Sequence, residues 1–239
     1  MLKDYSSKPI LITGAARSGT SMVAACFHLC GAWKGDTGGP SAYNEKGMFE
    51  NLPLRQEIVK PLFRDLGYDP LGQFPLPPTN KVKIPFDLRQ RVLANITKQG
   101  WTPETIWMYK CAKMSLLWPV WAFAFPESKW IIVRRRKEDI IFSCMQTAFM
   151  RSFNQPHILR RMGFKQPEEG WNYWVEFHEN KFNEIINQGI NTKVIWPEKM
   201  VKADYSELKD AIEWAGLQWN GQAVMEFIEP RLWRARRNK

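Results

Sequence analysis

The sequence predicts a single-domain α/β protein with a central, mostly parallel β-sheet and helices on both of its faces. Short apolar runs alternate with longer segments in which apolar residues recur at helical spacing. The first apolar run leads through a glycine-containing turn into a helix. The 239 residues are enough for one such domain with a proper core, so we expect one domain over residues 1–239.

Four apolar runs are predicted to be strands, at residues 10–12, 105–109, 129–133 and 192–196. Helices are predicted from apolar periodicity at residues 22–29, 54–66, 87–99, 115–125, 139–150, 171–187, 208–215 and 223–228. Residues 31–49 and 67–86 are rich in turn-forming residues and lack this periodicity, so they are candidate lid or substrate loops. In a parallel sheet, ligands gather at the carboxyl ends of the strands, which makes the polar residues there the candidate site.

The turn after the first strand has the features of an anion site. Gly14 and Gly19 allow the chain to approach an anion closely, and the following helix directs its N–H groups and positive dipole end to the same point. The loop nearly matches the phosphate-binding pattern GxxxxGK[ST], but Thr20 stands where lysine is expected and the cation is Arg17. A P-loop kinase or NTPase with a displaced cation is therefore one alternative, and a turn whose glycines serve packing alone is another.

The segment GAARSGTSMVA resembles the 5′-phosphosulfate loop of sulfotransferases, which use 3′-phosphoadenosine 5′-phosphosulfate (PAPS) as sulfuryl donor. The resemblance implies a P-loop-NTPase-like sulfotransferase fold of the bacterial or viral type. It also implies that PAPS, and its product PAP, bind through a set of loop residues: Ala16, Arg17, Ser18, Gly19, Thr20 and Ser21. The implied reaction is metal-independent, in-line transfer of a sulfuryl group to a hydroxyl or amine of an unknown acceptor, with Arg17 as one of the catalytic residues.

A second basic motif follows the third predicted strand. A strand-end arginine and a first-turn serine can bind one phosphate together, and Arg135 and Ser143 are eight residues apart. This spacing resembles the 3′-phosphate motif of sulfotransferases, although a basic turn before an N-capped helix would look the same. Cytosolic members also grip this phosphate with a Gly-containing C-terminal loop. Here Arg231, Arg234, Arg236 and Arg237 occur without glycine, so that contact is in doubt.

Two lysines follow the second predicted strand, Lys110 and Lys113. Many sulfotransferases carry a lysine near the end of this strand, and cytosolic members place a catalytic histidine two residues later. That position is Ala112 here, so a histidine-based mechanism is not supported. We expect Lys110 to be catalytic and both lysines to bind substrate; two ordinary surface lysines are the alternative.

Glu50 is the candidate base, because it follows a loop and precedes a helix, as the base does in some bacterial and Golgi-type sulfotransferases. Enclosure by Phe49 and other apolar groups would raise its pKa and suit it to accept a proton. We expect it to contact the acceptor as well. The alternative is a carboxylate that only stabilises the start of the helix.

Composition narrows the choice of partners. The formal net charge of +10 favours an anionic partner, but the twelve tryptophans fall in apolar stripes, which argues against the further alternative of a nucleic-acid-binding protein. The four cysteines form no metal pattern, no Walker-B-like aspartate follows a strand, and the first residues lack the apolar stretch of a signal peptide. We therefore expect a cytoplasmic enzyme, a monomer or homodimer, with a small-molecule or carbohydrate acceptor and no metal, nucleic-acid or membrane partner.

Overall fold

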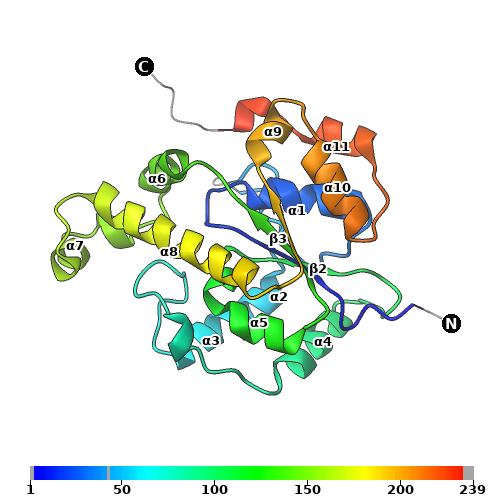
Figure 1. The fold of residues 1–239 in the computed structure, drawn as a ribbon, viewed down its shortest axis with the longest axis horizontal. Helices are drawn as coiled ribbons and strands as arrows, with labels where there is room; N and C mark the ends of the chain where they lie inside the picture. The colour runs from blue at the N-terminus through cyan, green and yellow to red at the C-terminus, as the bar shows by residue number, and fades with distance from the viewer. Residues whose placement is uncertain (1–2, 42–43, 234–239) are drawn as a thin grey trace.

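The computed structural model describes residues 3–41 and 44–233 (Figure 1). Its centre is a four-stranded parallel sheet in the order β2-β1-β3-β4. The strands are β1 (Ile10–Thr13), β2 (Met108–Lys110), β3 (Lys129–Val133) and β4 (Thr192–Ile195). The sequence-based prediction of an α/β fold with a parallel sheet is confirmed.

Both faces of the sheet are buried, which explains why the strands are continuous apolar runs. Neighbouring residues of a strand point to opposite faces, so Leu11 joins one core cluster, while Ile10 and Ile12 join the other. The first cluster packs against α2 to α8 and the second against α1 and α9 to α11. Figure 1 shows these two groups of helices on either side of the strands.

The helices differ in length, and α8 is much the longest in the described part of the chain. They are α1 (Thr20–Leu29), α2 (Leu52–Leu54), α3 (Lys60–Asp65), α4 (Leu88–Lys98), α5 (Trp118–Ala124), α6 (Lys137–Gln146), α7 (Pro156–Met162), α8 (Pro167–Asn187), α9 (Pro197–Val201), α10 (Ser206–Trp214) and α11 (Gly221–Phe227). None of the described helices is both long enough and apolar enough to span a membrane.

A π-helical turn, Arg55–Val59, joins α2 to α3. Its widened backbone is closed by a hydrogen bond from the Lys60 N–H to the Arg55 carbonyl. Pro61 follows at the start of α3, where it has no N–H to donate to the carbonyl of Glu57, as an α-helix would require. The proline thus accounts for a local departure from α-geometry that the predicted helix at 54–66 did not include.

Several predicted boundaries are wrong, each for a local reason. The second strand is shorter than 105–109, because the N–H of Thr105 closes a turn on the carbonyl of Thr102. The helix predicted at 115–125 begins as a 3-10 turn (Ala112–Leu117), and Pro119 lies at the start of α5. The sequence-based prediction missed α7 and α9; α9 has five residues, too few to show a helical stripe.

Candidate active site

The loop between β1 and α1 forms a cradle of backbone groups. A Cβ on Gly14 would lie 2.5 Å from the carbonyl oxygen of Val133, so only glycine fits there. Gly19 and Arg17 have φ values of 97° and 75°, which curl the loop into the start of α1. No described side chain caps that helix, and the buried hydroxyl of Ser18 has no hydrogen-bond partner among the described residues. The N–H groups in the first turn of α1 are the donors that an anion in front of the loop would satisfy.

The two predicted anion motifs meet at this cradle. The Nε of Arg17 donates to the Oγ of Ser143 at 2.9 Å, and Nη1 of Arg135 donates to the carbonyl of Arg17 at 2.8 Å. Burial lowers the pKa of Arg135 to about 10; Asp139 opposes this shift, and Arg17 adds to it. Arg135 and Ser143, more than 100 residues away from the loop in sequence, are therefore part of one basic site with it.

A cavity of about 180 Å³ opens in front of this basic site. Of the residues predicted to bind a cofactor, six line it: Arg17, Gly19, Thr20, Ser21, Arg135 and Ser143. Residues 44–47 and a C-terminal stretch ending at Trp233 complete its walls. The guanidinium of Arg135 lies over the Trp233 ring, 4.1 Å from its centroid. Two ion pairs tie the walls together: Lys46 Nζ to Glu229 Oε1 at 2.6 Å, and Arg231 Nη1 to Glu45 Oε2 at 3.4 Å.

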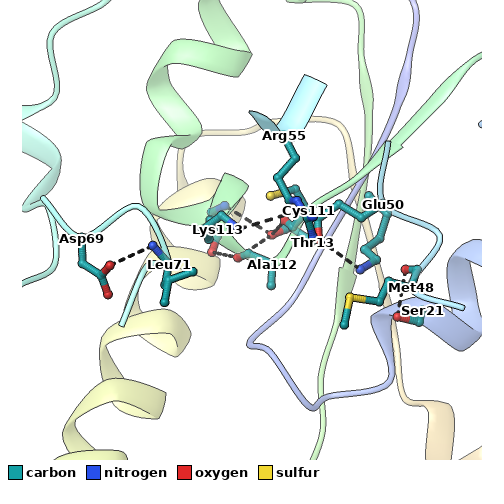
Figure 2. Close-up of polar contacts among 12 residues, drawn as sticks. Thr13, Ser21, Met48, Glu50, Arg55, Asp69, Leu71, Cys111, Ala112 and Lys113 are labelled. Atoms are coloured by element: carbon teal, nitrogen blue, oxygen red, sulfur yellow. Dashed lines mark hydrogen bonds and ion pairs between the residues drawn. The ribbon is translucent and has the colours of Figure 1, made fainter. Parts of the chain in front are cut away.

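A second cavity adjoins the first and contains Glu50 (Figure 2). Figure 2 shows Glu50, Arg55 and Lys113 directed toward one another from three separate segments. The Glu50 carboxylate lies 3.7 Å from Lys113 Nζ and 3.8 Å from both Lys110 Nζ and Arg55 Nη1. At these distances the charges pair without direct hydrogen bonds, so the donors and the carboxylate keep hydrogen-bonding capacity for a substrate.

The expectation of a raised pKa for Glu50 is wrong. Burial alone would raise it, but Lys113, Lys110 and Arg55 outweigh burial and lower the pKa of Glu50 to about 2. Burial lowers the pKa of Lys110, whereas the attraction of Glu50 overcomes burial and raises that of Lys113. The sequence shows the apolar neighbours of Glu50, but it does not show that three cations lie beside its carboxylate in the folded protein. Since both lysines pair with Glu50, they are not ordinary surface lysines.

His178 also lines the second cavity, a place that its apolar stripe in the sequence did not reveal. It is buried, and burial together with Lys181 lowers its pKa to about 3, so the ring is neutral. Its Nδ1 lies 3.1 Å from the Oγ of Ser115, whose hydroxyl donates to the carbonyl of Ala112. The other ring nitrogen, Nε2, is buried and has no hydrogen-bond partner among the described residues.

The two cavities share Arg17, Thr20, Ser21 and Asn44 in their walls. The structure places Arg17, Gly19, Thr20, Ser21, Arg135 and Ser143 at the first cavity, and Ala16, Glu50, Lys110 and Lys113 at the second. Ser18 is buried and lines neither cavity. The sequence-based prediction missed three lining residues: Arg55, Lys60 and Trp233. Some of the predicted positions lie outside the described residues, namely Arg234, Arg236, Arg237 and residues 42 and 43 of the candidate lid.

Within the described part of the chain, no group of three or more His, Cys, Asp or Glu side chains is arranged to hold a metal ion. The arrangement instead offers two adjoining compartments: one with anion-binding backbone and arginine groups, the other with a carboxylate among cations. A group held in the first compartment can thus face a second molecule across Arg17.

Three solved structures that are similar to this chain are sulfotransferases. The sulfotransferase domain from the curacin biosynthetic pathway superimposes with a TM-score of 0.56 at 15% identity, covering 93% of this chain and 78% of that one. The sulfotransferase from Alicyclobacillus acidocaldarius superimposes with a TM-score of 0.53 at 14% identity, covering 89% of this chain and 82% of that one. The sulfotransferase domain of the Synechococcus PCC 7002 olefin synthase superimposes with a TM-score of 0.52 at 13% identity, covering 93% of this chain and 77% of that one.

Neither a protein-family model nor a curated protein matches the sequence. The likeness to these structures is therefore one of fold, and it shows that the chain has the sulfotransferase fold.

Proposed function

We propose that the protein is a sulfotransferase that moves a sulfuryl group from PAPS to a hydroxyl of a small acceptor. The observation that carries this proposal is the junction of the two cavities at Arg17, Thr20 and Ser21. A fold shared with sulfotransferases supports it.

The first cavity suits PAPS by the chemistry of its donors. The uncapped start of α1 and the positive φ at Gly19 form a cradle for the 5′-phosphosulfate. Arg135 and Ser143 would hold the 3′-phosphate through charge-assisted and hydroxyl hydrogen bonds. PAPS, when bound, supplies an activated sulfuryl group whose bond to phosphate oxygen breaks as the acceptor oxygen bonds to sulfur.

Lys110 and Arg17 carry the electrostatic part of catalysis in this proposal. Both line the second cavity, and Arg17 also lines the first, so each can stabilise the negative charge that develops on the departing phosphate. Lys113 keeps the carboxylate of Glu50 in place and contributes to acceptor binding.

Glu50 is the proposed acceptor of the hydroxyl proton. Lys113, Lys110 and Arg55 keep it ionised, so it can always accept a hydrogen bond but is a weak base. A weak base suffices where the bond to the leaving group is largely broken before the proton moves, as in a loose transition state. The proton then passes from the acceptor oxygen to the carboxylate and on to solvent.

Replacing Arg135 tests the nucleotide assignment. Arg135→Ala should weaken PAP binding by roughly 1.5–3 kcal/mol, the loss expected for charge-assisted hydrogen bonds. Binding of adenosine 5′-phosphosulfate, which lacks the 3′-phosphate, should change far less. Isothermal titration calorimetry measures both, and Arg136→Ala, at a neighbouring arginine that lines neither cavity, is the matched control. Equal loss for the two nucleotides would contradict the assignment.

A further inference from the structure

The second cavity has a large excess of positive charge. Five basic side chains line it, and Glu50 is its one acidic residue among the described lining residues. The basic residues are Arg17, Arg55, Lys60, Lys110 and Lys113. His178 is neutral there, because burial lowers its pKa to about 3. This excess is more than one carboxylate can balance.

The proposed function accounts for only part of that charge. Arg17 and Lys110 would face the phosphate of the donor, which leaves three cations beside a single carboxylate. Of these, Arg55 and Lys113 pair with Glu50 at 3.8 and 3.7 Å. Lys60 has no ion-pair partner within 4.0 Å among the described residues, and the buried Nε of Arg55 has no described hydrogen-bond partner.

The π-helical turn is what brings Arg55 and Lys60 to the same cavity. In a regular α-helix two residues five positions apart point in directions that differ by about 140°. The π-turn instead closes the hydrogen bond from residue 60 to residue 55, so the two residues lie one turn apart on one side. Burial and the nearby cations Arg55, Lys113 and Arg64 lower the pKa of Lys60, as expected of a cation placed among others.

Part of the cavity lining is apolar. It is formed by Leu71, Phe149, Met150 and the buried Trp174, whose indole N–H donates to the carbonyl of Gly72. A ligand that fills the cavity therefore meets a cationic side, a carboxylate and an apolar side.

We propose that the acceptor is an anion: a hydroxylated molecule with a carboxylate, sulfonate or phosphate group bound by Arg55 and Lys60, and an apolar part against Trp174 and Phe149. This inference rests on the proposed function and names its substrate class. The negative charge of this group balances the positive charge that Glu50 alone does not neutralise. The hydroxyl of the acceptor then lies toward Glu50 and Arg17.

Calorimetry on the protein saturated with PAP tests the inference, because PAP fills the donor cavity and leaves the second one to the probe. The probes are four phenols on one scaffold: 4-hydroxyphenylacetate, 4-hydroxybenzenesulfonate, 4-hydroxyphenyl phosphate and the neutral 4-hydroxyphenylacetamide. We expect at least one charged phenol to bind roughly tenfold more tightly than the amide, and the preferred head group identifies the anion. Equal affinity for all four, or no binding of any charged phenol, would overturn the inference.

Two variants locate the preference within the molecule. Lys60→Gln should abolish most of the tenfold difference, whereas Lys98→Gln, an exposed lysine at the end of α4, should leave it unchanged. A preference that survives in Lys60→Gln would contradict the assignment to this cavity. Failure of PAP itself to bind would count against the proposed function, and the same four titrations on the nucleotide-free protein would still decide whether the cavity prefers anions.

Discussion

The two cavities share a wall but are built in different ways. In the first, the anion-binding groups come from two short segments: the turn after β1, and the end of β3 with the first turns of α6. Residues 44–47 and 227–233 complete its walls. The second combines side chains from the π-helical turn, the end of β2, the loop around Gly72 and the middle of α8. In the proposed function, the nucleotide-binding groups are therefore encoded locally, while the acceptor side depends on charges that only the fold brings together.

The variant with the largest expected effect on the reaction distinguishes the roles of the two cavities. Glu50→Gln keeps the shape of the side chain and removes its charge, so it should lower kcat by ~10²–10⁴-fold, as loss of a general base does. PAP affinity should stay within a few fold, since Glu50 does not line the first cavity. Steady-state kinetics with an identified phenol acceptor and calorimetry with PAP measure the two quantities. A variant with near-normal kcat would contradict the role of Glu50.

Acid titration measures the strength of the charge cluster around Glu50. Its pKa is lowered to about 2 in the folded protein from an ordinary value of 4.5, so the folded state gains stability from the ionised carboxylate. This contribution, about 3 kcal/mol, is complete above pH 4.5, is lost progressively as the pH falls and is gone below pH 2.

Urea unfolding between pH 2.5 and 6 should therefore show a steep loss of stability in the wild type that is much shallower in Glu50→Gln. Glu168→Gln, an exposed glutamate at the start of α8, is the control and should follow the wild type. Parallel curves for wild type and Glu50→Gln would show that the cations do not hold Glu50 ionised.

The smallest effect concerns the ion pair that joins the walls of the first cavity. Glu229→Gln removes the partner of Lys46, and we expect PAP to associate and dissociate a few fold faster with little change in its Kd. The effect is small because ion pairs near solvent contribute little. Stopped-flow binding measures both rates, with Glu226→Gln as the control; unchanged rates would show that the pair does not restrict access.

The same contrast explains what the sequence could predict. The strands and the anion loop follow from apolar runs and glycine positions that are local, and Arg135 and Ser143 follow from a spacing within one strand-helix unit. The pKa of Glu50 could not be predicted, because Lys110, Lys113 and Arg55 reach it from β2, the 3-10 turn and the π-turn. Lys60 was hidden for a related reason: only the wider turn before Pro61 brings it beside Arg55.

His178 and Trp233 show a further limit of the sequence. His178 lies within an apolar stripe of α8, and nothing in that stripe indicates that its unpartnered Nε2 belongs to a residue lining a cavity. Trp233 reaches Arg135 from the far end of the described chain, without a motif around it. Both depend on how distant segments pack against the sheet.

The central claim is that the first cavity binds a 3′-phosphorylated nucleotide rather than a nucleoside triphosphate with metal. Calorimetry in EDTA with PAP, set against ATP with Mg²⁺ in a separate titration, tests it most directly. We predict that PAP binds with one site per chain and more tightly than ATP with Mg²⁺; at 100 times its Kd, PAP should stabilise the folded protein by about 2.7 kcal/mol. Binding of ATP with Mg²⁺ as tight as that of PAP, or tighter, would contradict the account and favour an NTPase.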